Sequence, residues 1–494
     1  MSITVERTKI SITPDPTRVI LKSFIPGDKN RMQQIFNRIL TLTDQQVNQQ
    51  LEILKKGFQH RHKNFKQVLL HNYKIATKML DNEIQGSEER RQLFGAFFSH
   101  EYSIESAAFF NPSMVPHDNQ NNIPKGATHF IISFRAVGEG HISSIAFRTG
   151  IIDKDNEITI NPVSRFIGTG KHASNKKYNK IIFRKKLAEI GCDEYVSDLV
   201  VHKLDLEFDI FSLKEVIDEL CDINLASTRT KEAFDDIISL AETNYAMNYD
   251  PNSHLCERVL FPFSDAESKG IEDARFVQFF DEDGNMMYYA TYTAYSGNKF
   301  IPQLLKTPNF INFESMTLNG AAVQNKGMAL FPRKIGGWFM MISRQDNENL
   351  YIMTSDNINF WGKAELLYKP SKPWEMVQIG NCGSPIETPE GWILLTHGVG
   401  AMRQYCLGAI LLDLKDPFHV IGRLKEPFLV PNEEERDGYV PNALYTCGAM
   451  QHNDVLVIPY AMSDYKSSIA LVNTKELVHE MKSNSNQKER RRKT

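Results

Sequence analysis

Charged side chains recur at the ends of short apolar stretches in this chain, where a binding or catalytic site would need them. Asp273 and Arg275 begin one such stretch, and Arg135, Arg344 and His397 each end another. Two carboxyl groups that face one another can act as general acid and general base. Together with arginines and aromatic walls that hold hydroxyl groups, such acids suit a carbohydrate site.

Two glutamates are the other candidate acids. Glu387 lies in PIETPEGW, and Glu435 is the last of three consecutive glutamates in PNEEERDGYV, of which at most one is expected to be functional. Simpler explanations stay open for these residues. Asp273 beside Arg275 can be a structural ion pair, and Glu387 can be a solvated turn residue. His397 at the end of an apolar stretch can be a hydrogen-bonded core histidine.

The elements that would carry these residues repeat along the chain. From about residue 105, an apolar strand, a polar turn and a second apolar strand recur five times. The last three copies are roughly 50 to 60 residues apart, as in four-stranded propeller blades. The pattern predicts a mainly β fold, a five-bladed β-propeller. A two-sheet sandwich with long hairpins is the alternative, but it gives no reason for five similar units.

Helical patterns precede and interrupt the strands. Residues 1–104 are predicted to form a helical N-terminal region, in which Thr43 is a candidate N-cap. Residues 105–480 are predicted to form the propeller, with residues 175–250 as a helical insertion. The last residues, 481–494, are basic and are expected to be a disordered tail.

Composition excludes several classes of function. The chain has 494 residues and a net charge of -3, which argues against a broad nucleic-acid surface. Its six cysteines form no CxxC pair, and no histidines stand at zinc spacing, so no metal is expected. Because there is no apolar signal or long apolar run, we expect a cytoplasmic protein without a membrane partner. A homo-oligomer formed through the N-terminal helices is a further expectation.

Four segments of the strand region carry specific motifs. GIEDAR, followed by YYATYTAYSG, is similar to the signature GxEDPR…YxxYTA. KGMALFPRKIGGWFMMISRQ, GSPIETPEGWILLTHGV and PNEEERDGYVPNALYTCG follow in order. Together they resemble glycoside hydrolase family 130, which comprises β-mannoside phosphorylases and β-1,2-mannosidases. The resemblance leaves out the N-terminal helices and the insertion.

The resemblance implies a five-bladed propeller and an inverting single displacement on a β-mannoside. Asp273 falls at the family's general acid, which in the phosphorylases protonates the glycosidic oxygen through a sugar hydroxyl. Asn111 and Arg135 fall near positions that hold the sugar before the cleaved bond. A general acid needs a raised pKa, so Arg275 is expected to point away from Asp273 or to bind sugar or phosphate.

The resemblance leaves the attacking group open between water and phosphate. Glu387 stands where the phosphorylases carry a lysine, and a carboxylate there repels phosphate. Glu387 and Glu435 are therefore predicted to position a water, which favours a hydrolase. Lys326 and Arg344 match two basic phosphate-binding positions, so a phosphorylase that uses inorganic phosphate stays the alternative. A sugar-binding propeller without catalysis is the second alternative.

Overall fold

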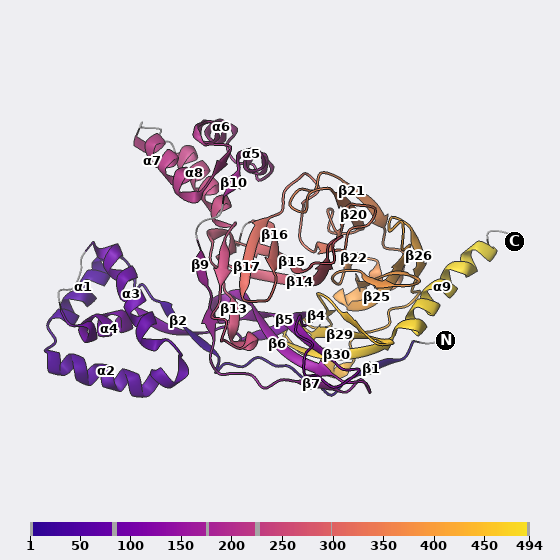
Figure 1. Cartoon of the computed structure of the whole chain (residues 1–494), viewed down its shortest axis with the longest axis horizontal. Helices are drawn as coiled ribbons and strands as arrows, with labels where there is room; N and C mark the ends of the chain where they lie inside the picture. The colour runs from indigo at the N-terminus through magenta and orange to yellow at the C-terminus, as the bar shows by residue number, and fades with distance from the viewer. Residues whose placement is uncertain (1–2, 82–85, 174–176, 223–227, 298, 492–494) are drawn as a thin grey trace.

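The computed structural model describes residues 3–81, 86–173, 177–222, 228–297 and 299–491 (Figure 1). It contains a strand-rich body and two separate groups of helices, one at the N-terminal end of the chain and one inserted between strands. None of the helices in these ranges combines the length and the apolar content that a membrane-spanning segment requires.

Most strands of the body belong, in the described ranges, to five antiparallel groups that follow one another along the chain. The first contains β4 (Ala108–Pro116), β5 (Thr128–Val137), β6 (Ser143–Ile152) and β7 (Ile158–Ile160). The second contains β14 (Gly270–Phe280), β15 (Met286–Tyr295), β16 (Phe300–Thr307) and β17 (Asn312–Thr317). The third contains β18 (Ala329–Leu330), β19 (Phe339–Ser343), β20 (Leu350–Ser355) and β21 (Ala364–Tyr368).

The last two groups are built in the same way. The fourth contains β22 (Gln378–Asn381), β23 (Ile386–Thr388), β24 (Gly391–Val399), β25 (Tyr405–Leu412) and β26 (Val420–Arg423). The fifth contains β27 (Leu444–Tyr445), β28 (Met450–His452), β29 (Val455–Met462) and β30 (Lys466–Asn473). The recurring strand pattern of the sequence therefore corresponds to a mainly β body.

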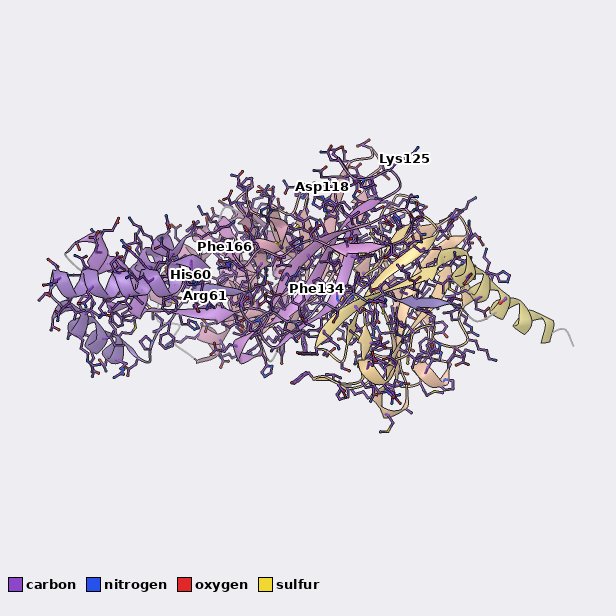
Figure 2. All side chains as sticks on the ribbon, turned by 90° about the horizontal axis from the view of Figure 1, so that it is seen from below. His60, Arg61, Asp118, Lys125, Phe134 and Phe166 are labelled. Atoms are coloured by element: carbon purple, nitrogen blue, oxygen red, sulfur yellow. The ribbon has the colours of Figure 1, made fainter. Side chains whose placement is uncertain are left out.

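Apolar clusters join each group to the next one along the chain, because the strands alternate side chains between their two faces. One further cluster joins the fifth group back to the first through Val457, Ile469 and Phe134, a buried ring labelled in Figure 2. Representative pairs in the other four clusters are Val115 and Ile271, Val277 and Met341, Ile342 and Leu394, and Leu407 and Ile458.

The start of the chain completes the fifth group, which the sequence prediction missed. β1 (Val5–Arg7) pairs antiparallel with β30, with Val5 opposite Val472. Three residues are too few to show a strand period, so the segment was predicted as part of the helical region. At the other end, α9 (Thr474–Arg491) follows β30 directly, and the predicted boundary at residue 481 falls inside this helix.

The N-terminal helices form their own small core. They are α1 (Lys29–Leu40), α2 (Asp44–Phe58), α3 (Phe65–Leu80) and α4 (Glu88–Phe97), between β2 (Val19–Ser23) and β3 (Ser99–Ser103). Thr43 caps α2 in a capping box with Gln46, as the sequence predicted. The core packs rings such as Phe36, Phe94 and Phe98 together. At the junction with the strand body, the Lys63 ammonium lies 5.6 Å from the centre of the Phe166 ring.

The inserted helices extend from the outer edge of the second group. β9 (Lys171–Ala173) pairs with β12 (Ala246–Asn248), which in turn pairs with β17. Two of the inserted helices, Ile210–Asp222 and Thr228–Glu242, lie where the sequence has amphipathic patterns, and their apolar residues pack in one core with those of two earlier helices. The elements between β9 and β12 are β10 (Tyr178–Asn179), α5 (Lys180–Glu189), α6 (Glu194–Lys203), β11 (Glu207–Phe208), α7 (Ile210–Asp222) and α8 (Thr228–Glu242). Two short strands, β8 (Gly168–Thr169) and β13 (Arg258–Leu260), link the insertion to β6.

A buried ion network connects the N-terminal segment to the first group. Glu105 lies between Arg18 and Arg148, and all three side chains are buried. Arg148 Nη2 donates to Glu105 at 2.8 Å, and Arg18 also donates to the Ser164 and Cys256 carbonyls. Removing one partner of such a network leaves the others charged without compensation in a low-dielectric interior.

We therefore expect Glu105→Gln to lower the free energy of unfolding by about 3 to 5 kcal/mol. Urea unfolding followed by circular dichroism measures the change. The matched control is Lys29→Ala, which breaks the exposed pair of Lys29 with Asp81 and should leave the unfolding midpoint almost unchanged. Equal midpoints for Glu105→Gln and the control would contradict the importance of the buried network.

Candidate functional site

A cavity of about 620 Å³, including the part open to solvent, brings together residues from several strand groups. Its wall contains six residues that the sequence analysis identified as candidates: Asn111, Arg135, Asp273, Lys326, Arg344 and His397. The prediction that these side chains converge from different repeats agrees with this arrangement.

Two β-bulges place the amide of Asn111 against the carboxyl group of Asp273. The register of β4 shifts between Phe110 and Ser113, and that of β14 shifts between Glu272 and Arg275. Asn111 and Asp273 both have a positive φ, 48° and 51°, which Asn and Asp tolerate better than most residues. Asn111 Nδ2 donates to Asp273 Oδ1 at 2.7 Å. Backbone strain of this kind is often found at functional sites.

The neighbouring acid, Glu272, has a different role from Asp273. Its two carboxylate oxygens accept from Arg135 Nη2 at 2.8 Å and from Lys326 Nζ at 3.2 Å. Arg135 Nη1 lies 3.6 Å from Asp273 Oδ1. Glu272 therefore orients two cations, and of these two neighbouring acids it is Asp273 that lines the cavity.

The expected pKa of Asp273 is wrong in direction. Burial raises the pKa of this carboxyl group, but the charges of Arg135, Arg275 and Lys326 and the hydrogen bond from Asn111 outweigh burial and lower it below its ordinary value. These groups therefore favour the ionised form of Asp273. The sequence identified Asp273 as a candidate acid, but it did not show that three cations lie close enough to lower its pKa.

Arg275 lies behind the acid rather than in the cavity wall. Its Nη1 donates to the Asp273 backbone carbonyl at 2.9 Å, and its Nη2 donates to the Tyr445 hydroxyl at 2.7 Å. The guanidinium thus makes no hydrogen bond to the carboxylate, in line with the expectation that it points away. Its charge still contributes to the low pKa of Asp273.

Arg344 and His397 form a second cationic part of the cavity. Arg344 Nη1 donates to His397 Nε2 at 3.3 Å. Burial and the charges of Arg344 and Arg275 lower the pKa of His397 well below its usual range, so the imidazole is neutral and can accept. Gly380 makes this arrangement fit, since a Cβ at residue 380 would lie 2.3 Å from the His397 ring. His397 is thus both a buried hydrogen-bonded histidine and part of the cavity wall.

The structure corrects the placement of Glu387. This residue pairs with Trp392 at the start of β24, whereas His397 lies five residues further along the same strand. At 3.3 Å per residue, the two positions are about 16 Å apart. Glu387 makes a bidentate ion pair with Arg333, at 2.8 and 2.6 Å, beside a different cavity. It does not face Asp273 across a water.

Glu435 is also absent from the cavity wall, because it is used to hold two chain segments together. It is buried and accepts two hydrogen bonds from Arg7, at 2.9 and 3.1 Å, and one from the Tyr460 hydroxyl at 2.7 Å. Burial raises its pKa, but the hydrogen bonds from Arg7, the Asn432 backbone and Tyr460 outweigh burial and lower it. Glu435 is thus an ionised anchor for the N-terminal strand.

No metal site accompanies these groups in the part of the chain that the structure describes. No three His, Cys, Asp or Glu side chains there lie close enough to hold an ion. The cavity is instead rich in arginine and lysine, which suit anionic and hydroxyl-bearing ligands.

Comparison with known proteins identifies the family. A sequence model of glycoside hydrolase family 130, described as β-1,4-mannooligosaccharide phosphorylase, matches residues 231–483, about half of the chain. The 1,2-β-oligomannan phosphorylase of Thermoanaerobacter sp. is 33% identical over 248 residues, which cover 48% of this chain and 80% of that protein. The chain belongs to glycoside hydrolase family 130. This confirms the resemblance drawn from the four motifs.

Another relative and its solved structure are also similar to the chain. The β-1,2-mannobiose phosphorylase of Listeria innocua is 29% identical over 288 residues, which cover 56% of this chain and 79% of that protein. A solved structure of the Listeria innocua enzyme with β-1,2-mannobiose aligns with 77% of this chain and 93% of its own, at 22% identity and a TM-score of 0.45. That score is too low for the structural likeness to carry weight here.

In this family 130 chain, the sequence analysis missed several cavity residues. The most informative is Asp464, in the turn between β29 and β30. Burial, and then the charge of Asp273, raise the pKa of Asp464 to about 6, against the opposing charges of Arg135, Arg403 and Lys326. A polar turn inside the fifth repeat was the available signal. The other missed residues of the wall are Gln378, Arg403, Tyr405, Val440, Ala443 and Tyr445.

The raised pKa of Asp464 predicts a pH-dependent stability. Because this pKa, about 6, lies above the ordinary value of 3.8, the protonated side chain favours the folded state at low pH. That contribution is lost as pH rises from about 4 to about 7. We expect the wild type to lose stability relative to Asp464→Asn over this window, in urea unfolding at a series of pH values.

The control for this prediction is Asp454→Asn, at an exposed aspartate paired with Lys475. The stability difference between the wild type and this variant should not show the same trend. A difference between wild type and Asp464→Asn that does not change with pH would show that Asp464 has an ordinary pKa.

Proposed function

We propose that this protein is an inverting β-mannoside phosphorylase that acts on β-1,2-linked manno-oligosaccharides and releases mannose 1-phosphate. The observation that carries the proposal is the cavity itself, in which the carboxylate of Asp273 lies among the cations Arg135, Lys326 and Arg344. The relatives named above are phosphorylases of β-1,2-linked mannosides. The alternative that the sequence analysis placed second, phosphorolysis, is therefore better supported than hydrolysis.

The hydrolase hypothesis depended on carboxylates that the cavity does not contain. Glu387 and Glu435 were the residues meant to activate water, and each is held elsewhere by an arginine. Asp464 is a second carboxyl group in the wall, so attack by a water that Asp464 assists is the competing reaction. The product assay below separates the two.

Free hydrogen-bond donors in the cavity favour an anionic co-substrate. Arg344 Nε is buried and lacks a hydrogen-bond partner among the described residues, while Nη1 is held by His397. Lys326 is partly exposed at the cavity, where it pairs with Glu272 and lies over the Phe300 ring. An arginine fork and an ammonium are typical phosphate ligands. We assign Lys326 and Arg344 to phosphate, with His397 orienting Arg344.

The sugar before the cleaved bond is assigned to the Asn111 side of the cavity. Asn111 Oδ1 and Arg135 Nε are buried without partners in the described part of the structure, and can hydrogen-bond sugar hydroxyl groups. A phosphate oxygen then bonds to the anomeric carbon from one face, while the bond from that carbon to the glycosidic oxygen breaks on the other. The leaving oxygen takes one proton, which Asp273 supplies through a sugar hydroxyl.

Phosphate can itself provide the protonation that this step needs. The cations around Asp273 lower its pKa and favour its ionised form. A phosphate anion bound to Lys326 and Arg344 offsets their charge and adds a negative charge near Asp273, and both effects raise a carboxyl pKa. Asp273 then takes up a proton from solvent before it gives one to the leaving oxygen. The lowered pKa of Asp273 is compatible with general acid catalysis for this reason.

The proposal includes the architecture that positions the cavity. We propose that the five antiparallel groups are the blades of a five-bladed β-propeller, with β1 as the closing strand of the last blade. The apolar cluster between the fifth and first groups supports this. Residues 105–480 would then form the catalytic domain, to which the N-terminal helices and the 175–250 insertion are additions.

The first test is the product. With β-1,2-mannobiose, we expect turnover to require inorganic phosphate and to yield mannose 1-phosphate, measured by chromatography or phosphorus NMR. Asp273→Asn should lower kcat by about 100- to 10,000-fold, because it keeps the left-handed backbone but cannot supply a proton. Free mannose formed at the same rate without phosphate would instead support hydrolysis. Turnover of β-1,4-mannobiose but not of β-1,2-mannobiose would contradict the proposed β-1,2 specificity.

The second test separates the phosphate ligands from Glu387. Arg344→Ala should raise the KM for phosphate by about tenfold or more, since a buried charge-assisted hydrogen bond is lost. Its effect on the KM for the mannoside should be smaller. Glu387→Gln, outside the cavity, should keep wild-type kinetics. Loss of activity in Glu387→Gln with little change in Arg344→Ala would reverse these assignments.

A further inference from the structure

The turns at one end of the strand groups surround the cavity. Arg135 lies near the end of β5, and the turn that follows contains a short helical segment, Glu139–His141. Arg403, in the turn between β24 and β25, and Asp464, in the turn between β29 and β30, both line the cavity. These three turns therefore lie at its mouth.

An exposed aromatic pair connects the turn after β5 with the loop that precedes the fifth strand group. The rings of His141 and Tyr439 lie 5.9 Å apart and are tilted by 33°. Tyr439 precedes Val440, which lines the cavity, and its own side chain is 76% exposed. His141 has a positive φ of 57°, an uncommon backbone conformation for a residue other than glycine. The pair thus joins the first strand group to the loop before the fifth.

The loop that carries Tyr439 is held firmly. Val440 N donates to the Ser463 carbonyl at 3.0 Å, and Ser463 Oγ donates to the Glu435 carbonyl at 2.7 Å. Glu435 is itself fixed by Arg7 and Tyr460. An exposed tyrosine on a fixed loop loses little conformational freedom when it binds a ligand, so its ring is a preformed surface.

We propose that His141 and Tyr439 form an outer acceptor subsite, which stacks against a sugar beyond the two that flank the cleaved bond. This inference rests on the proposed phosphorylase function. The sugar that is transferred occupies the buried wall of Asn111, Arg135 and Asp273, so the rest of an oligosaccharide must leave through the mouth. A flat aromatic surface there matches the apolar face of a pyranose ring. The subsite makes the protein prefer oligosaccharides longer than a disaccharide.

The test compares two substrates in one assay. For the wild type, we expect kcat/KM for phosphorolysis of β-1,2-mannotriose to exceed that for β-1,2-mannobiose. Tyr439→Ala should lower the ratio of these two values by about fivefold, the size of one aromatic contact. Tyr439→Phe keeps the ring and should restore the ratio. His141→Ala should lower the ratio in the same direction.

The matched control is Tyr195→Ala, because Tyr195 is 71% exposed on α6, in the inserted helices. It should leave the ratio unchanged. The subsite is wrong if Tyr439→Ala leaves the ratio of the two kcat/KM values unaltered, or lowers kcat/KM equally for both substrates. In either case, phosphorolysis by the wild type would still support the proposed phosphorylase function. If the wild type forms no mannose 1-phosphate from either substrate, the proposed function fails and the subsite with it.

Discussion

The constraint on which the site depends is the burial of one carboxylate among several cations. Asp273 is stable as an anion at this position because Arg135, Arg275 and Lys326 surround it and Asn111 donates to it. Burying a charge without such partners is costly. The two β-bulges are the local means of achieving this, since a regular strand at residues 111 and 273 would not turn both side chains toward each other.

The same cations need a counter-charge of their own, and Glu272 supplies it. By holding Arg135 and Lys326 at fixed positions, Glu272 leaves Asp273 bound mainly through a neutral amide. Among the described residues, Arg135 Nε and Arg344 Nε are buried without a hydrogen-bond partner, so both guanidinium groups keep a free donor. Under the proposed function, a phosphate anion offsets the charge of these cations, which a neutral water would not do.

Sequence reasoning was strongest where the signal is periodic or where a charge interrupts an apolar stretch. The strand repeats predicted the mainly β body, and residues such as Arg135, Arg344 and His397 were found because they end apolar strands that converge on one cavity. Other features carry no such signal. β1 is three residues long, and β30, the strand with which it pairs, lies more than four hundred residues away in the sequence. The low pKa of Asp273 depends on cations that are distant along the chain.

Glu387 shows why a matching motif does not by itself place a side chain at a site. The motif around it includes His397, and both residues belong to one strand pair, so they look like neighbours in the sequence. A β-strand, however, advances 3.3 Å per residue, so residues at its two ends face opposite ends of a sheet about 16 Å apart. Asp464 is the opposite case, because it follows β29 at the cavity end of the fifth group and had no motif to identify it. For a cavity at one end of the strands, the end of the strand at which a residue lies therefore determines whether its side chain can reach the cavity.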